Sequence, residues 1–293
     1  MTVKLGLRWT IGDVSDRGFE ALRLSIHGAV GVFGVDTAYV VYVNSLPVAE
    51  ARARTGPVPA IVEWRAAPNE IPAILRDRLD QRMAEGVAWK LLPLSAFPDR
   101  HELALDNDVI LWEAPEAIRL WLADPSGNGR VLAEDVAMGH GVFAALCGPE
   151  PRNSGIRGTP AGFDLAAAMA RVLAAASRRI DSELDEQGLQ VAALSIDGPP
   201  LVVRTEEVTI CSPFWPHQPH LGRCGAHFVG LNARHIPWNY YDRPGTEVRA
   251  EHWDGHRERL YARLGIECLG RSSGFSMANS SSGSTTVRPS GVV

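Results

Sequence analysis

Two aspartates between two apolar runs are the first residues in this sequence whose types and spacing point to chemistry. In the segment from His101 to Trp112, HELALDNDVILW, the apolar runs are interrupted by Asp106 and Asp108. A buried Asp is rare unless it is paired or binds a metal. Two Asp side chains one residue apart on an extended segment point the same way, so together they offer a hard divalent cation two oxygen ligands. The simpler alternative is a polar turn between two strands.

The alternation of strand-like and helix-like segments around this pair predicts where it lies in the fold. In the first half the predicted strands cover residues 3–9, 38–43, 60–64 and 103–105, and the predicted helices cover 15–27, 47–54, 70–85 and 115–122. This order predicts a three-layer α/β/α fold with a mostly parallel central sheet. Ligands of open α/β sheets bind outside the carboxyl ends of strands, and the Asp pair follows such an end.

The second half of the chain is less regular. We expect strands over 141–147, 201–203 and 208–211, helices over 164–179, 185–194 and 251–264, and loops over 152–162 and 212–223. The segment 271–293 is rich in Ser and Gly and is expected to be a disordered tail. Residues 1–270 show no internal repeat and no linker, so we expect one domain there.

Composition excludes several classes of protein. The 293 residues are 45% hydrophobic and 22% charged, with a net charge of -5 and a pI near 6.0. These values argue against a nucleic-acid or anionic-membrane partner. No apolar run approaches the roughly 18 to 20 residues of a membrane span, and the N-terminus lacks the features of a signal peptide. The cysteines show no metal-type spacing, so we expect a cytoplasmic protein.

Four clusters of chemistry-bearing residues then follow in a set order: Lys90, the Asp106/Asp108 pair, Asn153-Ser154-Gly155 with Asp185-Glu186-Gln187, and His227-Phe228-Val229-Gly230. This order resembles that of the retaining glycosyltransferases of the glycogenin and bacterial lipopolysaccharide-galactosyltransferase type (glycosyltransferase family 8). Their pattern has a basic residue, Asp-x-Asp, an Asn-Ala/Ser-Gly loop, Asp-Gln-Asp, and His-Phe-x-Gly-x-x-Lys-Pro-Trp. Members have the Rossmann-like GT-A fold and use nucleotide-sugar donors with Mn²⁺. The resemblance covers roughly residues 90 to 238.

The resemblance implies a role for each matched residue. The metal ligands would be Asp106, Asp108 and His227, and an imidazole ligand suits Mn²⁺ better than Mg²⁺. The donor would be bound by the other polar and glycine positions of the pattern, which are Lys90, Asn107, Asn153, Gly230, Arg234 and Thr10. The catalytic candidates are Asp185, Glu186 and Gln187, with Gln187 or Glu186 beneath the anomeric carbon.

The sequence departs from the family pattern at two places. Between Gly230 and Pro237 the segment LNARHI is three residues longer than in the family, and Ile236 stands in place of the lysine. Either Arg234 or His235 therefore contacts the diphosphate, or the contact is missing. The second departure is Asp-Glu-Gln in place of Asp-Gln-Asp, which leaves open the side chain beside the reacting carbon. The N-terminal nucleotide-binding strand matches only in outline.

The function that follows is transfer of a hexose from a nucleotide-diphospho-sugar, UDP-linked, to a saccharide or other hydroxyl acceptor, with retention implied by the family. A divalent ion and fixed cations would stabilise the charge that builds on the departing diphosphate. One alternative is a sugar nucleotidyltransferase, but the segment 9–13, WTIGD, lacks the glycine-rich basic loop of that class. The other is a homologue that binds a nucleotide sugar without turnover.

Each assignment also has a purely structural alternative. Lys90 can be a surface residue, His227 a satisfied core histidine, Asp185 the N-cap of a helix and Asn153 a turn residue. Elsewhere, two histidines in the segment 217–220, HQPH, have zinc-like spacing, but the proline between them favours a loop.

Overall fold

The computed structural model describes residues 3–68, 70–76, 78–79, 88–124, 126–176 and 179–268. The predicted tail over 271–293 lies outside the described residues, as do residue 77 and residues 80–85 of the segment that was predicted as a helix.

A seven-stranded sheet forms the centre of the molecule, in the order β3-β2-β1-β4-β7-β6-β8. Its strands are β1 (Leu5–Ile11), β2 (Ala38–Val43), β3 (Val62–Ala66), β4 (His101–Leu105), β6 (Val131–Glu134), β7 (Arg152–Thr159) and β8 (Leu201–Val203). Every neighbouring pair is parallel except the two that β7 makes, with β4 and with β6. The predicted mostly parallel sheet is therefore confirmed.

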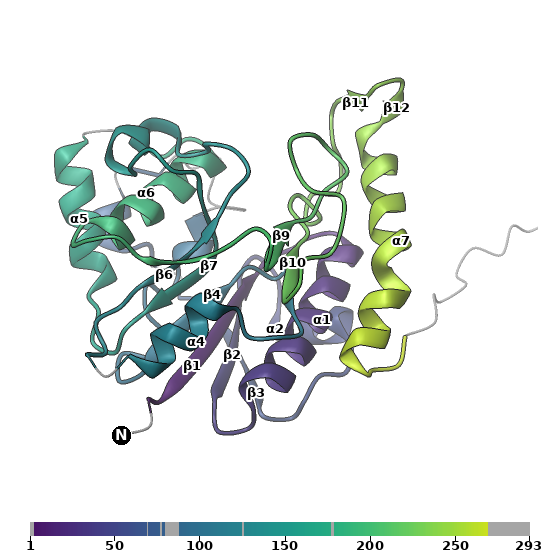
Figure 1. Cartoon of the computed structure of the whole chain (residues 1–293), viewed down its shortest axis with the longest axis horizontal. Coiled ribbons are helices and arrows are strands. Elements are labelled where there is room, and N and C mark those ends of the chain that lie inside the picture. Colours follow the sequence, from purple (N-terminus) through teal and green to yellow (C-terminus); the bar gives the residue numbers. More distant parts are fainter. Residues whose placement is uncertain are drawn as a thin grey trace, which may run out of the picture.

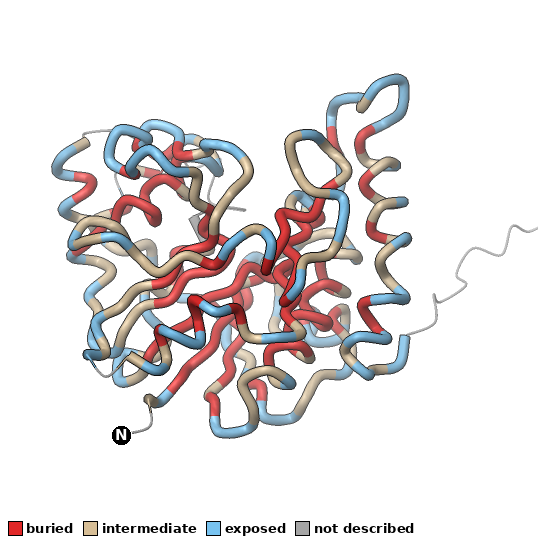
Figure 2. Tube along the Cα trace, in the orientation of Figure 1, coloured by how far each residue is buried: buried red, intermediate tan, exposed pale blue. Residues whose placement is uncertain are grey.

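Helices cover both faces of this sheet, which confirms the predicted three layers (Figure 1). One face packs against α1 (Asp16–Phe33), α2 (Val48–Thr55) and α4 (Glu116–Ala123). The other packs against α5 (Leu165–Ala175) and α6 (Glu183–Ser195), together with α3 (Ala73–Arg76) and the 3₁₀ helix η3 (Gly141–Leu146). In Figure 2 the central strands and the inner sides of these helices are the most buried parts, as expected when apolar surface drives folding.

A second, three-stranded sheet adjoins the large one where the Asp pair lies. It contains β5 (Val109–Leu111), β10 (Gly225–His227) and β9 (Val208–Ile210), and β5 begins directly after the Asp pair that follows β4. The last helix, α7 (Gly245–Leu264), packs beside α1, and the short strands β11 (Asn239–Tyr240) and β12 (Arg243–Pro244) precede it. The acidic pair thus lies at the junction of the two sheets.

Two sequence-based expectations were wrong in this part of the fold, and one strand was missed. Residues 141–147, predicted as a strand, form η3. The segment 152–162, predicted as a loop, contains the eight-residue strand β7, and β6 was not predicted at all. Strand β7, RNSGIRGT, lacks a regular alternation of apolar residues because its polar side chains face other buried polar groups.

No helix among the described residues is long and apolar enough to span a bilayer.

Two glycines of α1 offer a matched test of how closely this helix packs on the small sheet. A Cβ at Gly28 would collide with the carbonyl oxygen of Leu111, whereas a Cβ at Gly31 would meet nothing. We expect Gly28→Ala to lower the free energy of unfolding by about 1–3 kcal/mol through overpacking. Gly31→Ala should instead raise it by about 0.5–1 kcal/mol, because alanine stabilises a helix relative to glycine. Denaturant unfolding of both variants measures this, and equal effects would contradict the packing.

Candidate active site

Asp106, Asp108 and His227 meet at the junction of the two sheets. The two aspartates lie in the turn between β4 and β5, and His227 ends β10, where its backbone pairs with Val109. The Nε2 atom of His227 lies 3.3 Å from Oδ1 of Asp108 and 3.8 Å from Oδ2 of Asp106. All three residues are buried, and one ligand atom from each falls within 4.8 Å of the others.

The hydrogen bonding of these three residues fits a cation ligand set. Oδ1 of Asp108 is buried and has no hydrogen-bond partner among the described residues, and the same holds for Nδ1 of His227. A buried carboxylate oxygen without a donor is costly, and a divalent cation would satisfy it. Carboxylate oxygens with one imidazole nitrogen form a donor set suited to Mn²⁺ and related ions. These residues therefore fit the metal that the sequence pattern implied.

Strand β7 holds the triad in place through its backbone. The amide of Asp106 donates to the carbonyl oxygen of Gly155 at 2.8 Å. A side chain at Gly155 would overlap the imidazole of His227, so only glycine allows the strand to pack on this ring. The pairing of β6 with β7 also shifts register between Leu132 and Ala133. Such irregularities redirect strands next to functional sites, and this one sets the Asn-Ser-Gly segment against the triad.

A half-buried lysine compensates the negative charge of the triad. Lys90, in the 3₁₀ helix η2 (Ala88–Leu91), donates from Nζ to Oδ2 of Asp106 at 2.6 Å. Burial alone would raise the pKa of Asp106, but the charges of Lys90 and Arg157 outweigh burial and hold this pKa below its usual value. Burial would likewise lower the pKa of His227, but the neighbouring carboxylates of Asp108 and Asp106 raise it overall.

Next to this group lies a third buried carboxylate, Glu186 on α6. Its Oε1 accepts from Gln190 and lies 4.0 Å from Nη1 of Arg157 on β7. Burial raises the pKa of Glu186 to about 7, although Lys90 and Arg157 act in the opposite direction. Glu186 is thus partly protonated near neutral pH. Arg157 was missed in the sequence because it lies in a segment that was expected to be a loop.

The neighbours of Glu186 on α6 have different environments. Both carboxylate oxygens of Asp185 accept backbone N–H groups, from Val142 at 2.8 Å and from Asp181 at 3.0 Å. Asp185 is not the N-cap of α6, because Ser182 occupies that position. The half-buried Gln187 joins two segments: its Nε2 donates to the carbonyl of Gly139 at 2.8 Å, and its Oε1 accepts from the amide of Ser154 at 3.3 Å.

Asn153 lies in β7 and not in a loop turn. Its Oδ1 accepts from the amide of Gly155 at 2.7 Å, and its Nδ2 donates to Oδ2 of Asp135 at 3.0 Å. The side chain of Asn107 is also fully engaged. Its Nδ2 donates to Gly18 and to Asn232, and its Oδ1 accepts from Asn232 at 2.9 Å. Asn107 thereby ties the turn of the Asp pair to α1 and to the segment after Gly230.

The remaining predicted donor residues lie around the carboxyl end of β1. Thr10 is half-buried near the end of that strand. Arg234 pairs with Asp13 just beyond β1, and Arg54 binds the same carboxylate at 2.7 Å. Gly230 adopts a φ of 80°, which favours glycine, and its carbonyl accepts from Arg249. Asn232, which contacts the turn of the Asp pair, was not identified from the sequence.

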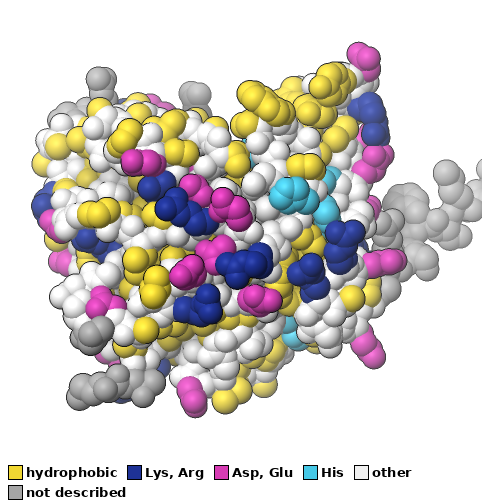
Figure 3. Space-filling model, viewed as in Figure 1, with side chains coloured by type: hydrophobic (Ala, Val, Ile, Leu, Met, Phe, Trp, Pro, Cys, Tyr) yellow, Lys and Arg dark blue, Asp and Glu magenta, His cyan; other side chains and the backbone are white. Residues whose placement is uncertain are grey.

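The surface is hollowed between the part of the molecule that carries α5 and α6 and the part that carries β11 and β12 (Figure 3). The carboxyl end of β1, and with it that of the parallel β4, points towards this hollow (Figure 1). The triad at the end of β4 therefore lies where an open α/β sheet binds its ligands.

This architecture is that of the GT-A glycosyltransferases. A structure of the galactosyltransferase LgtC in complex with donor and acceptor sugar analogs matches with a TM-score of 0.50 at 13% identity, over 91% of this chain and 98% of that one. An active-site mutant of LgtC matches with a TM-score of 0.48 at 13% identity, over 85% and 95%. The bifunctional glycosyltransferase WbbM matches at 0.47 and 14% identity, over 90% and 52%. No protein-family model and no curated protein matches the sequence. At 13% identity, the match to the LgtC complex at a TM-score of 0.50 shows a shared fold and nothing finer.

The raised pKa of Glu186 leads to a prediction about stability. The pKa of Glu186 is about 7 in the folded protein, against an ordinary value of 4.5. Between these two pH values the carboxyl therefore binds more protons in the folded state than in the unfolded state. The contribution of Glu186 to the free energy of unfolding therefore falls as the pH rises from 4.5 to about 7. We expect the free energy of unfolding of the parent to fall between pH 5 and pH 8 relative to that of Glu186→Gln, by on the order of 2 kcal/mol. Urea unfolding at both pH values tests this, and a pH-independent difference would show that Glu186 is not protonated.

Proposed function

We propose that this protein is a metal-dependent glycosyltransferase that transfers a hexose from a nucleotide-diphospho-sugar to a hydroxyl acceptor. The observation that carries the proposal is the convergence of Asp106, Asp108 and His227 at the carboxyl end of β4, with one carboxylate oxygen left without a donor. The fold shared with LgtC supports this function, because it places the triad at the ligand-binding end of the sheet.

The metal in this proposal is Mn²⁺ or Mg²⁺, bound by the triad. When bound, it would act as a Lewis acid towards the two phosphates of the donor. Lys90 keeps Asp106 ionised and thus able to bind the cation. Asn107 and Asn232 hold the acidic turn through their paired amides. UDP is the proposed nucleotide, as the resemblance of the motifs implies.

Gln187 is the proposed residue beneath the anomeric carbon. It is half-buried, and its amide contacts Ser154, the neighbour of the glycine that packs on the imidazole of His227. Asp185 is a poor nucleophile here, because both its oxygens accept backbone N–H groups. Glu186 is buried and partly protonated. This environment supports transfer with retention and without a covalent intermediate on either carboxylate.

An aromatic group near β11 and β12 is the proposed acceptor surface. Phe214 stacks edge-on against Trp238 and Tyr240, with ring centroids 4.6 Å and 5.1 Å apart. Trp238 is 47% exposed and Tyr241 is 85% exposed, so neither ring belongs to the core. Hydrophobic side chains gather at this end of the molecule, on one side of the hollow (Figure 3). Exposed aromatic faces are suited to packing against sugar rings.

Thermal melting with nucleotides tests the metal site. With Mn²⁺ we expect UDP to raise the melting temperature more than GDP, ADP or CMP, because a ligand of the native state stabilises it. The shift should vanish with EDTA and in the Asp108→Ala variant, which keeps its fold. Asp36→Ala removes an exposed carboxylate far from β4 in sequence and should keep the full shift. An unchanged UDP shift in Asp108→Ala would overturn the metal assignment.

The role of Gln187 predicts a separation of binding from turnover. We expect Gln187→Ala to keep the Mn²⁺-dependent UDP shift but to lower UDP release from a panel of UDP-hexoses by about 10²-fold, the size of effect that removing one positioned polar group has. The control is Leu184→Ala, on the same helix and 52% exposed, which should release UDP at the parental rate. Metal-dependent UDP binding without UDP release from any donor in the parent would favour the non-catalytic alternative.

A further inference from the structure

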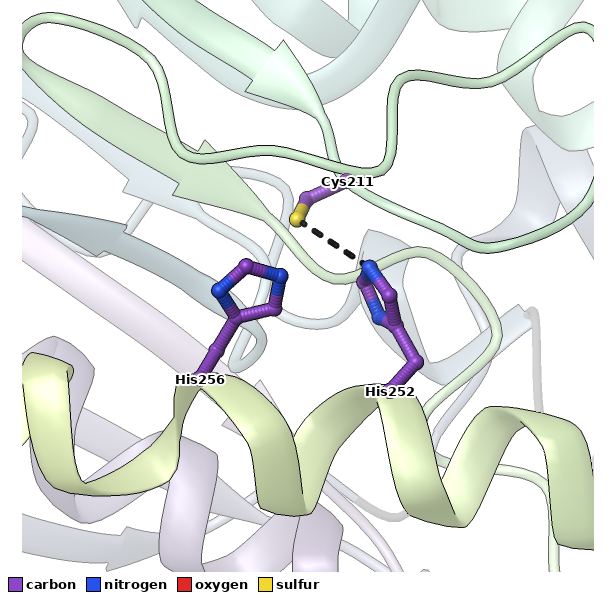
Figure 4. Close-up of side chains that lie close together, drawn as sticks. All are labelled: Cys211, His252 and His256. Atoms are coloured by element: carbon purple, nitrogen blue, oxygen red, sulfur yellow. Dashed lines mark hydrogen bonds between the residues drawn. The ribbon is translucent and has the colours of Figure 1, made fainter.

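A second cluster of potential metal ligands lies away from the acidic turn. Cys211 follows β9, and His252 and His256 lie one turn apart on α7. The Sγ atom of Cys211 is 4.0 Å from Nε2 of His252, and one ligand atom from each of the three residues lies within 4.8 Å of the others. Both imidazole rings extend from α7 towards the sulfur (Figure 4).

This cluster is separated from the triad by strand β10. Successive side chains of an extended strand point to opposite sides. His227 faces the acidic pair, whereas the ring of the next residue, Phe228, lies 6.2 Å from His252 and 6.0 Å from His256. The amide of Cys211 donates to the carbonyl oxygen of His227 at 2.7 Å. The two clusters are therefore connected by a backbone hydrogen bond, but no side chain belongs to both.

Hydrogen bonding alone explains this arrangement poorly. The Nε2 atoms of His252 and His256 both approach one acceptor, the carbonyl oxygen of Pro219, at 3.2 Å and 3.0 Å. Nδ1 of His256 is buried without a partner among the described residues. Two imidazoles and a thiol thus converge, and the hydrogen bonds to Pro219 leave Nδ1 of His256 unsatisfied.

We propose that Cys211, His252 and His256 bind a Zn²⁺ ion that connects the end of β9 to α7. One thiolate and two imidazoles form a borderline-soft donor set that suits zinc. Ideal tetrahedral bonds would place the sulfur about 3.6 Å and the second nitrogen about 3.4 Å from a ligand nitrogen. The observed spacings of 4.0 Å and at most 4.8 Å are therefore within about 1.5 Å of that geometry. A water molecule would take the fourth position.

Binding would require one proton to leave the cluster. Burial raises the pKa of the Cys211 thiol to about 12, so without metal it is protonated at neutral pH. Zinc would replace this proton, and the imidazoles would bind in their neutral form. Because burial lowers the pKa of His252 and of His256, both rings already favour that form.

Such a site would cross-link two elements that are far apart in the sequence. The ion would join the end of β9 to α7, and the amide of Cys211 is hydrogen-bonded to the residue that ends β10. The loop 212–223 would be anchored at its start, where Cys211 precedes it. This proposal does not depend on the proposed glycosyl transfer.

Cobalt spectroscopy of the full-length protein distinguishes this site from the acidic triad. After metal removal with a chelator, titration with Co²⁺ should give a thiolate-to-cobalt charge-transfer band that reaches its plateau at one equivalent. Zn²⁺ should then abolish the band by displacement. The acidic triad contains no sulfur and cannot give this signal. Absence of the band in the parent would overturn the proposal.

Three variants identify the ligands. Cys211→Ser should lose the band, whereas Cys147→Ser, which removes another buried thiol, and Cys268→Ser, which removes an exposed one, should keep it. His256→Gln keeps the thiol and should weaken Co²⁺ binding by more than the roughly 10-fold cost of losing an outer-shell partner. This second variant decides the matter if Cys211→Ser does not fold. A band that survives in Cys211→Ser, or unchanged affinity in His256→Gln, would contradict the site.

Discussion

The balance of buried charge at the end of β4 is the constraint on which the rest of this structure depends. Asp106, Asp108 and Glu186 are buried close together, and isolated carboxylates cannot be buried without a large free-energy cost. Lys90 pairs with Asp106, and Arg157 lies beside Glu186. Burial also raises the pKa of Glu186, which reduces the negative charge that is buried. Oδ1 of Asp108 is buried without a hydrogen-bond donor among the described residues, so the proposed cation would complete the balance.

The backbone around the site is adapted to this charge. Strand β7 runs against its neighbours, carries polar residues and glycines, and has a register shift where it meets β6. These features would weaken an ordinary strand. Here they let Gly155 contact both the backbone of Asp106 and the ring of His227. His227 and Gln187 would thus come from a strand and a helix, which supports precise positioning of a donor.

Strand β10 links the two proposed metal sites. His227 and Phe228 point to opposite sides of it, one towards the acidic turn and the other towards the histidines of α7. A structural ion at Cys211 would hold the strand end that carries His227, and the hydrogen-bonded pair of Asn107 and Asn232 holds the facing turn. The metal-binding histidine of the proposal would therefore be held from both sides.

The amino-acid sequence by itself determined the layers of the fold and the acidic pair, because β-branched runs such as β2 and the local Asp-x-Asp spacing depend on near neighbours. The order of the motifs along the chain also identified Lys90 and His227 as candidate site residues. Only the tertiary structure decided that β7 is a strand, since its partners β4 and β6 supply the hydrogen bonds that its composition does not predict. It likewise decided that Arg157 compensates Glu186, that Asn107 binds Asn232, and that Cys211 meets two histidines of α7. These contacts join residues far apart in sequence, and local pattern carries no information about which distant side chains folding brings together.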